Sequence, residues 1–445
     1  MRIKLSDLSE IFPSAAIHSD AVFSGVSIDS RTVYPNDIFV ALHGKNFNGH
    51  DYIDEAIKQG ASAVLSEVDL TDIPYIKVED THRALIDLAL YYSSMIKPNI
   101  IGITGTNGKT TVTDLTAKIT GHYKHTTKTF GNFNNNIGLP LSILKSKIDS
   151  EIFVLEMGAS KKGDIKELLN IAKPNIVALL NVSPAHLDTF GTLENVLSTK
   201  EEIFLNQGFD KKVILNKSDQ YFDRWVKKNK LNNIITISKD DQTADYSAME
   251  VSDKELSVKT PYEPEFKLRV TNTKSHNILN ILFSIALACE IGARSKHILS
   301  AMTDYDGVEG RSKVYAGINN SKIIDSSYNA NPQSFMASIN SLVKLDGNPW
   351  LIMGDMGELG DNSEFYHKQV VQHAYEMGIK KLFVISKYAS AILKEFGKNS
   401  YDFDSIDALI SFIKPQLNDN VNILVKASRF MEFEIIVNAL TERND

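Results

Sequence analysis

The chain has 445 residues, more than a single hydrophobic core supports, and this length predicts about three domains. Hydrophobic residues make up 43% and charged residues 23%, as in an ordinary globular protein. The net charge of −7 argues against a surface that coats nucleic acid, so we expect no nucleic-acid partner.

Cysteine usage and apolar patterning point to one compartment. The only cysteine, Cys289, cannot form an intramolecular disulfide. The first residues, "MRIKLSDLSEIF", lack the apolar stretch of a secretory signal, and no apolar run approaches the roughly 20 residues that span a bilayer. We therefore expect a cytoplasmic protein without a transmembrane segment, acting as a monomer.

The first predicted domain is a small α/β unit over residues 1–96. Its apolar runs are "DIFVAL" (37–42) and "SAVLSE" (62–67), and "DYIDEAIKQGA" (51–61) between them has helical spacing. "MIKPN" (95–99) then interrupts the pattern, because proline disfavours helix in the residue before it. We place a domain boundary there.

Strands and helices alternate over the second predicted domain, residues 97–310. The predicted strands are "NIIGITG" (99–105), "EIFVLEMG" (151–158), "NIVALLNV" (175–182) and "KKVILN" (211–216). The predicted helices are 108–121, 192–204 and "HNILNILFSIALACEIGA" (276–293). The polar segment 217–272 lies between the last of these strands and the last of these helices. This alternation predicts a doubly wound, mostly parallel sheet.

The alternation restarts in the third predicted domain, residues 311–445. Its predicted strands are 321–327, 349–356, 380–386 and 421–428, and helical spacing covers 332–345 and 363–378. We expect a second, Rossmann-like α/β domain.

A glycine-rich loop, "GITGTNGKTT" (102–111), lies between a predicted strand and a predicted helix, which is the context of a phosphate-binding loop. It differs from the usual G-x-x-x-x-G-K-[ST] pattern, because Ile103 occupies the first glycine position. Backbone N–H groups of such a loop bind phosphate oxygens, with a lysine at the β- and γ-phosphates and a hydroxyl on Mg²⁺. The residues expected there are Gly105, Thr106, Asn107, Gly108, Lys109, Thr110 and Thr111.

Other candidates allow more than one interpretation from pattern alone. Glu156 ends a buried strand, where it could bind a cation, cap a helix or form a surface ion pair. His186 and Lys200 could be ordinary loop and helix residues. Asn277 and Asn280 share a face of a helix's first turn, which suits the edge of a purine or helix capping.

Polar loops follow three strands of the third domain, as expected for one rim of a ligand cleft. They are "IIDSSYNANP" (323–332), "GDMGELGDNSEFYH" (354–367) and "LVKASRFME" (424–432). Arg311, at the boundary between the second and third domains, suits a phosphate.

Taken in order, the motifs resemble the Mur ligase family over nearly the whole chain, and G-x-x-G-x-x-G-K-T-T is the form that this family's ATP loop takes. The other motifs are "GNFNNNIGLPLSIL" (131–144), "EMGAS" (156–160), "AHLDTFGTLENVLSTKEEIF" (185–204), "SYNANPQS" (327–334) and "GDMGELG" (354–360). The likeness is greatest to the members that add D-alanyl-D-alanine to UDP-N-acetylmuramoyl-tripeptide. The resemblance implies that ATP phosphorylates the tripeptide carboxylate and that the dipeptide amine attacks the acyl phosphate.

The resemblance also implies that four residues take part in catalysis: Lys109, Glu156, His186 and Lys200. Thr110 and Glu156 would hold one Mg²⁺, His186 would help to bind a second, and Lys200 matches a lysine that CO₂ carbamylates. The implied ATP contacts are Asn277 and Asn280 at adenine, Arg311 at the γ-phosphate and Asp325 at the ribose. The implied substrate contacts are Ser30, Arg31, Asn132, Asn135, Asn329 and Asn331.

The chain departs from the family pattern at two positions. Ser326 stands where the family usually has the ribose-binding aspartate, with Asp325 one residue earlier. Ala427 replaces the glycine of a K-G-S-R motif, and alanine tolerates positive φ poorly.

Other functions remain open at this point. The chain could be a different Mur-type or folylpolyglutamate-type ligase, a P-loop kinase or ATPase, or a non-catalytic scaffold. A kinase would leave "GNFNNNIG" and the third domain without a role, and a scaffold would not need Lys109, Glu156 and Lys200.

Overall fold

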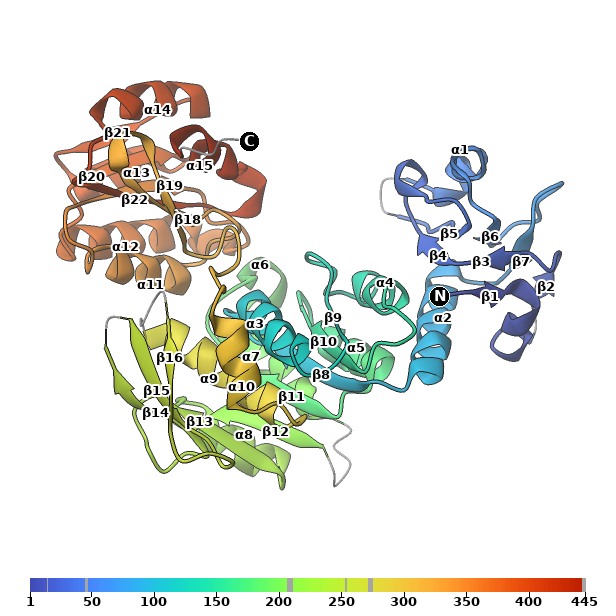
Figure 1. The fold of residues 1–445 in the computed structure, drawn as a ribbon. Coiled ribbons are helices and arrows are strands. Elements are labelled where there is room, and N and C mark those ends of the chain that lie inside the picture. The colour runs from blue at the N-terminus through green and yellow to red at the C-terminus, as the bar shows by residue number, and fades with distance from the viewer. Residues whose placement is uncertain (14, 45–46, 206–210, 253, 271–274, 442–445) are drawn as a thin grey trace.

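The computed structural model describes residues 1–13, 15–44, 47–205, 211–252, 254–270 and 275–441. Within these residues the strands form four sheets, and each of the three larger sheets lies within one predicted domain. Figure 1 shows the three parts in chain order, from blue through green to red. The chain therefore has the predicted three-part α/β architecture, while the boundaries at residues 96 and 310 stay predictions. Within the described ranges no helix is long and apolar enough to cross a membrane.

The N-terminal part contains a sheet in the order β2-β7-β6-β5-β4, in which only β2 runs antiparallel to its neighbour. The strands of this part, including a β1-β3 pair, are β1 (Ile3–Lys4), β2 (Ala16–Ile17), β3 (Val22–Phe23), β4 (Gly25–Ser27), β5 (Asp37–Val40), β6 (Ala63–Ser66) and β7 (Tyr75–Lys77). Its helices are α1 (Ile53–Gln59) and α2 (Thr81–Ile96). Every residue of β5 and β6 is buried, as expected for parallel strands covered on both faces.

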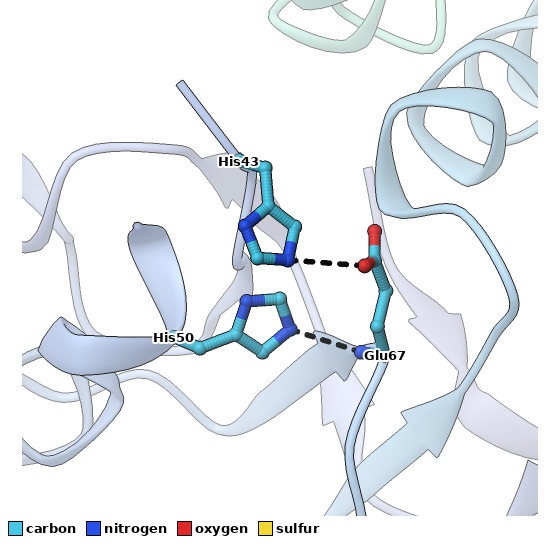
Figure 2. Close-up of side chains that lie close together, drawn as sticks. All are labelled: His43, His50 and Glu67. Carbon is cyan, nitrogen blue, oxygen red and sulfur yellow. Dashed lines mark hydrogen bonds and ion pairs between the residues drawn. The ribbon is translucent and has the colours of Figure 1, made fainter. Parts of the chain in front are cut away.

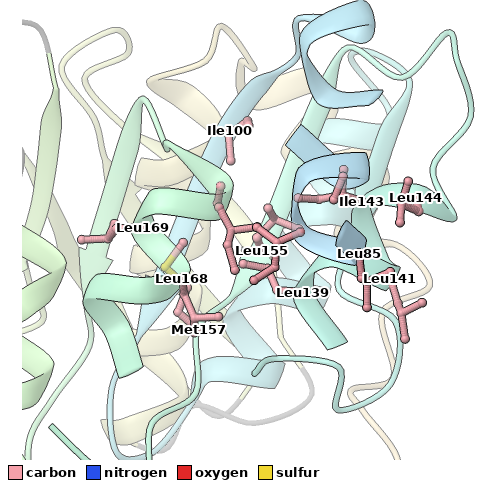
Figure 3. Packing of buried hydrophobic residues seen from close by; sticks show 14 of the residues in the cluster. Leu85, Ile100, Leu139, Leu141, Ile143, Leu144, Leu155, Met157, Leu168 and Leu169 are labelled. Atoms are coloured by element: carbon pink, nitrogen blue, oxygen red, sulfur yellow. The ribbon is translucent and has the colours of Figure 1, made fainter. Parts of the chain in front are cut away.

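Helix α2 joins the N-terminal part to the centre of the molecule. Its Leu85 shares one hydrophobic cluster with Leu139 and Leu141 of α4 (Gly138–Leu144), as Figure 3 shows. The buried Tyr92 hydroxyl donates a hydrogen bond to the Ser146 carbonyl at 2.9 Å. Packing across this junction fixes the position of the loop before α4. This loop forms part of the candidate active site.

Nine of the described strands form the central sheet, in the order β16-β15-β14-β13-β12-β11-β8-β10-β9. They are β8 (Asn99–Thr104), β9 (Thr126–Lys128), β10 (Ile152–Glu156), β11 (Ile176–Leu179), β12 (Lys212–Asn216), β13 (Ile234–Ser238), β14 (Tyr246–Val251), β15 (Glu255–Lys259) and β16 (Phe266–Arg269). The run from β9 to β14 is parallel, and β15 and β16 are antiparallel. No helix or strand was predicted over 217–272, although this segment holds the helix α8 (Phe222–Asn229) and strands β13 to β16. Strands β14 to β16 escaped prediction because they extend the sheet edge and carry polar, partly exposed residues.

Alternate residues of the central strands face two different helical layers. Ile101 and Ile103 of β8 pack with α3, α9 and α10, whereas Ile100 packs in the cluster of α4, α5 and α7. The central helices are α3 (Lys109–Gly121), α4, α5 (Asp164–Ala172), α6 (Leu187–Phe190), α7 (Leu193–Glu201), α8 (Phe222–Asn229), α9 (Ser275–Cys289) and α10 (Ser295–Met302). The sheet is doubly wound, as predicted.

The C-terminal sheet has the order β17-β18-β22-β19-β20-β21, and all of it except β17 is parallel. Its strands are β17 (Lys313–Ala316), β18 (Lys322–Ser326), β19 (Asn348–Gly354), β20 (Lys381–Ile385), β21 (Ser400–Asp402) and β22 (Val421–Lys426). Three helices pack on one face and two on the other: α11 (Pro332–Leu342), α12 (Ser363–Glu376) and α13 (Ala389–Phe396), then α14 (Ile406–Ile413) and α15 (Glu434–Leu440). The sequence predicted four of these strands and missed the short edge strands β17 and β21.

Candidate active site

The glycine-rich loop connects β8 to α3 and packs closely against α9. Gly108 has φ of 88°, and a Cβ atom added there would lie 2.6 Å from Oδ1 of Asn280 on α9. Only glycine fits both the left-handed conformation and this close approach. Asn280 thus lies against the loop itself, so one of the two asparagines expected at a purine is beside the phosphate-binding segment.

Lys109 is the first residue of α3, and the loop wraps around it. Its ammonium donates a hydrogen bond to the Gly105 carbonyl at 3.0 Å. Burial lowers the pKa of Lys109, Glu156 opposes this shift, and Arg311 adds to it. The neighbouring Thr106 hydroxyl donates to the Ser183 carbonyl at 3.2 Å, which fastens the loop to the segment that follows β11.

Glu156, the last residue of β10, lies in a cluster suited to a cation. The Thr110 hydroxyl donates to Glu156 Oε2 at 2.9 Å, and Asn134 Nδ2 donates to Oε1 at 2.7 Å. Arg311 Nη2 in turn donates to the Thr110 hydroxyl oxygen at 3.2 Å. Glu156 is only 4% exposed, which excludes a surface ion pair, and its two carboxylate oxygens accept hydrogen bonds from side chains. Hydroxyl and carboxylate oxygens are ligands that Mg²⁺ prefers, so these residues fit that ion.

Asn134 is a site residue that sequence reasoning missed, although it lies in the quoted motif "GNFNNNIG". The motif offers several asparagines, and only the tertiary structure shows which of them contacts Glu156. Of the two residues chosen from sequence, Asn135 accepts the Gly138 N–H at 2.8 Å at the start of α4. Asn132 and Asn135 both line the same cavity as Glu156.

His186 contacts the C-terminal part of the chain through a residue that the sequence analysis did not select. Its Nδ1 lies 2.5 Å from Oε2 of Glu358, in the loop after β19. This pairing lowers the pKa of the Glu358 carboxyl. Among the described residues no hydrogen bond involves Nε2 of His186. A histidine that gives one ring N–H to a carboxylate and keeps the other nitrogen free has the usual arrangement of a metal ligand.

Lys200 lies on α7 and is only 3% exposed, so it is not an ordinary solvated helix lysine. Burial lowers its pKa to about 7, with a smaller contribution from the charge of Lys109. A large fraction of such an amine is neutral near neutral pH, and only the neutral amine can react with CO₂. The environment therefore fits carbamylation chemically.

The C-terminal part supplies one wall of the site, which contacts the glycine-rich loop and is held together by contacts among its own residues. Asn331 Nδ2 donates to Oδ1 of Asn107 in the glycine-rich loop at 2.8 Å. The Arg311 guanidinium lies 4.0 Å from the ring centre of Tyr328. Lys426 donates to the Asn329 carbonyl at 2.9 Å, and burial lowers its pKa to about 7.

Two cavities meet in this region. The first, about 470 Å³, includes the glycine-rich loop, Asn277 and Asn280, and the second, about 490 Å³, includes Asn132, Asn135, Glu156 and Lys200. The residues common to both are Thr106, Lys109, Ala185, His186, Arg311 and Asn329. A group that passes from one cavity to the other must therefore cross this shared wall, with Lys109 and Arg311 beside it.

Comparison with known proteins covers the whole chain. Models of the "Mur ligase family, catalytic domain", the "Mur ligase middle domain" and the "Mur ligase, glutamate ligase domain" match residues 22–93, 103–288 and 310–429. The UDP-N-acetylmuramoyl-tripeptide–D-alanyl-D-alanine ligase of Escherichia coli is 31% identical over 447 residues, which cover 99% of this chain and 98% of that protein. The chain belongs to the Mur ligase family.

Two solved structures of this family are also similar. MurF from Acinetobacter baumannii superposes with a TM-score of 0.90 at 25% identity, covering 100% of this chain and 99% of the other. MurF from Thermotoga maritima, in complex with ADP, gives a TM-score of 0.82 at 28% identity over 93% of this chain and 96% of the other. These matches confirm the fold class and the family predicted from the sequence motifs.

Two expected contacts of this Mur ligase lie away from the two cavities. The Ser30 hydroxyl donates to Glu55 at 2.8 Å, and Arg31 pairs with Asp29 at 2.7 Å. Neither Ser30 nor Arg31 is among the residues that line the cavities, so their role at the UDP end of a substrate stays a prediction.

Asp325 is not placed as the ribose contact that the family pattern implied. Its carboxylate accepts the N–H groups of Ser327 and Gly310, both at 3.0 Å, and it does not line either cavity. Ser326 lines the first cavity instead. The carboxylate fixes the backbone at the start of the C-terminal part. Ala427, the other departure from the pattern, does not have positive φ, so its side chain causes no strain of this kind.

A second group of potential metal ligands, shown in Figure 2, lies in the N-terminal part of this Mur ligase. His43 Nε2 lies 3.1 Å from Glu67 Oε2. His50 accepts the Glu67 N–H on Nε2 at 3.0 Å, and its Nδ1 is 2.9 Å from Asn48 Oδ1. Since both ring nitrogens of His50 are engaged, this group acts as a hydrogen-bonded tie between the segment before α1 and the end of β6.

Proposed function

We propose that this Mur ligase joins D-alanyl-D-alanine to UDP-N-acetylmuramoyl-tripeptide at the expense of ATP, giving the UDP-linked pentapeptide for peptidoglycan synthesis. The observation that carries the proposal is the pair of cavities that meet at Lys109 and Arg311. Full-length similarity to a D-alanyl-D-alanine ligase supports the choice of substrates. We also propose a role for each of the three predicted domains. Domain 1–96 binds the UDP end of the substrate, domain 97–310 binds ATP, and domain 311–445 binds D-alanyl-D-alanine.

The first step transfers the γ-phosphoryl group of ATP to the terminal carboxylate of the tripeptide. A carboxylate oxygen attacks phosphorus, the bond to the β-phosphate oxygen breaks, and ADP and an acyl phosphate result. Both reactants are anions, so the barrier depends on positive charge at the transferred group and on in-line positioning. Lys109 and Arg311, in the wall common to both cavities, supply that charge.

Thr110 and Glu156 would hold a magnesium ion at the β- and γ-phosphates, because the Thr110 hydroxyl and the Glu156 carboxylate already lie together. When bound, Mg²⁺ neutralises charge on the phosphates and holds them in line. We propose that His186 and a carbamylated Lys200 hold a second ion. His186 presents Nε2 while Glu358 holds Nδ1, and the neutral Lys200 amine would become a carboxylate-like ligand.

The second step forms the peptide bond. The amine of D-alanyl-D-alanine attacks the acyl carbon, the tetrahedral intermediate expels phosphate, and the amine loses its proton. One oxygen of the original carboxylate leaves with the phosphate. Asn132 and Asn135 on one side, and Asn329 and Asn331 on the other, are proposed contacts for the substrates, since all four line the cavities. A monomeric state and a cytoplasmic location remain predictions.

The test is a reconstituted reaction with ATP, Mg²⁺ and UDP-muramoyl-tripeptides that end in meso-diaminopimelate or L-lysine. We expect phosphate release and a pentapeptide product by mass spectrometry only when D-alanyl-D-alanine is present. Single amino acids, tested in parallel, distinguish other Mur-type and folylpolyglutamate-type ligases. Equal phosphate release without any amine acceptor would identify a kinase or simple ATPase and contradict the proposal.

A further inference from the structure

The loop between β19 and α12 connects the C-terminal part of the chain to the central part. In addition to the contact between the Glu358 carboxylate and His186 Nδ1, the Glu358 carbonyl accepts the Asp188 N–H at 3.4 Å. His186 and Asp188 lie at the start of α6, in the segment that follows β11. The position of His186 relative to the C-terminal part therefore depends on where this loop holds Glu358.

Both residues of the contact have an unusual backbone conformation. Glu358 has φ of 63° and His186 has φ of 52°, in the left-handed region. Residues other than glycine rarely adopt this conformation, and they keep it only where the surrounding structure holds it. The Glu358 side chain is also 56% exposed, and an exposed pair fixes little by itself. The position of Glu358 must therefore be set by its neighbours in the loop.

The neighbours of Glu358 are held by the core of the C-terminal part. Met356 and Leu359, on either side of Glu358, are each 2% exposed and pack in the same hydrophobic cluster. The Gly357 N–H donates a hydrogen bond to Ser428 Oγ at 2.8 Å. The N–H of the buried Met356 also needs an acceptor, because an unpaired N–H group in the core is costly.

His367, on α12, provides this acceptor. It is 0% exposed, and its Nε2 accepts the Met356 N–H at 2.9 Å. Since a backbone N–H can only donate, Nε2 carries no proton, so the proton is on Nδ1, which donates to the Ser363 carbonyl at 2.6 Å. Ser363 is the first residue of α12. The imidazole therefore joins the start of the loop to the helix that ends it.

The surroundings of His367 keep the ring neutral. Burial lowers its pKa, the Ser363 carbonyl and Asp355 oppose this shift, and Lys387 adds to it. The Asp355 carboxylate lies 3.8 Å from Nε2, beyond hydrogen-bonding distance, and the Tyr388 ring lies 4.7 Å away between ring centres. A protonated ring would direct a second N–H group at the loop N–H that Nε2 now accepts.

We infer that His367 is a positioning residue of this ligase, because its neutral imidazole holds the loop from which Glu358 contacts Nδ1 of His186. His367 lines neither cavity, so it acts through Glu358 and not by touching a substrate. The inference rests on the proposed function for the task of His186, which is to hold a metal ion. The contact itself can be measured without substrates or metal.

The test compares two variants that each keep one half of the imidazole. His367→Asn places an amide N–H near the position of Nδ1 and leaves Met356 without an acceptor, whereas His367→Gln places its oxygen at the position of Nε2. Nitrogen-15 NMR of the metal-free protein at about pH 8 gives the tautomer of His186, whose signals are assigned by their loss in His186→Asn. We expect the Nδ1–H tautomer in wild type and in His367→Gln. In His367→Asn, as in Glu358→Ala, we expect mainly the Nε2–H tautomer that free histidine prefers.

His373→Asn is the matched control, because this histidine also lies on α12 but contacts Asn340 at the surface, with 2.7 Å between Nε2 and Oδ1. It should leave the tautomer of His186 unchanged. The Nδ1–H tautomer of His186 in folded His367→Asn would overturn the inference. If that variant does not fold, the Nε2–H tautomer of His367 in wild type, or of His186 in His367→Gln, would overturn it instead.

A double-mutant cycle separates positioning from a purely structural role. His367→Asn should raise the Mg²⁺ concentration for half-maximal activity about 10-fold to 100-fold, and it should raise it no further when Glu358→Ala is already present. Effects that multiply in the double variant would show that His367 does not act through Glu358. Because the NMR measurement needs no turnover, the expected tautomers in a protein that does not ligate the dipeptide would contradict the proposed function alone.

Discussion

The two cavities share Lys109 and Arg311 but differ in the rest of their lining. The first has buried apolar residues in its wall, among them Leu115 and Phe283, together with the glycine-rich loop. The second is lined by the asparagine loop before α4 and by Glu156 and Lys200, which suit a charged, flexible substrate and metal ions. The difference separates two kinds of effect: changes in the shared wall should reduce turnover itself, whereas changes within one cavity should act on what that cavity binds.

The largest effect is expected for Lys109→Ala, which removes positive charge from the shared wall. Loss of one such contact typically costs about 100-fold to 1,000-fold in kcat. Turnover is measured with both substrates saturating, and circular dichroism checks the fold. Lys118→Ala, further along α3 and paired with Asp304, should keep the wild-type kcat. A folded Lys109→Ala protein with near-wild-type kcat would show that this lysine does not act at the transferred phosphoryl group.

Substitutions of Lys200 test whether its carbamate holds a metal ion in the second cavity. Lys200→Ala should be nearly inactive and should recover part of its activity when a small carboxylic acid is added, because the acid replaces the carbamate. Lys200→Arg keeps a positive charge and should be inactive with or without the acid. Lys166→Ala, an exposed lysine on α5, serves as the control. High activity of Lys200→Ala in bicarbonate-free buffer would assign Lys200 a purely structural role.

Glu358→Gln tests how the C-terminal part acts on the shared wall, because Glu358 lines the first cavity and contacts His186, which lines both. The change leaves the shape but weakens the hold on His186 Nδ1, so the Mg²⁺ concentration for half-maximal activity should rise about 10-fold to 100-fold. Activity is titrated with Mg²⁺ at saturating ATP. Glu364→Gln, in an exposed ion pair with Lys368, provides the comparison. Identical Mg²⁺ titrations for Glu358→Gln and wild type would remove His186 from the metal site.

The smallest effect concerns Lys426, a buried lysine of the first cavity whose pKa is lowered to about 7. Between this value and the ordinary lysine pKa, the unfolded chain binds more protons than the folded one, so stability rises with pH. The contribution is at most about 1.4 kcal/mol per pH unit. Lys426→Met should therefore show a smaller increase in the urea midpoint from pH 7 to pH 9 than wild type. Equal increases would mean that Lys426 titrates normally in the folded protein.

Much of the fold could be predicted because the central parallel strands are buried on both faces. Their apolar runs, such as Ile152–Glu156, can be recognised in the sequence without knowing which strands pair with them. Strands β14 to β16 could not be found in this way, since they are partly exposed at a sheet edge and their pairing depends on neighbours far along the chain.

Only some of the site residues could be predicted, because others depend on contacts between distant parts of the chain. The glycine-rich loop is local in sequence, so its residues could be named together with Lys109 and Thr110. Asn134 and Glu358 owe their roles to contacts across 22 residues in one case and between the central and C-terminal parts in the other. Periodicity does not show such contacts. For Asp325, a position in a motif suggested a ligand contact, whereas the structure shows its carboxylate accepting backbone N–H groups, so the ribose contact stays a prediction.

The central claim is that a phosphoryl group crosses the shared wall to the tripeptide carboxylate. It is tested most directly with UDP-muramoyl-tripeptide labelled with oxygen-18 in both oxygens of that carboxylate. After a complete reaction with ATP and D-alanyl-D-alanine, the account predicts one oxygen-18 atom in each phosphate released and one in the new peptide carbonyl. Unlabelled phosphate, formed together with the pentapeptide, would contradict it.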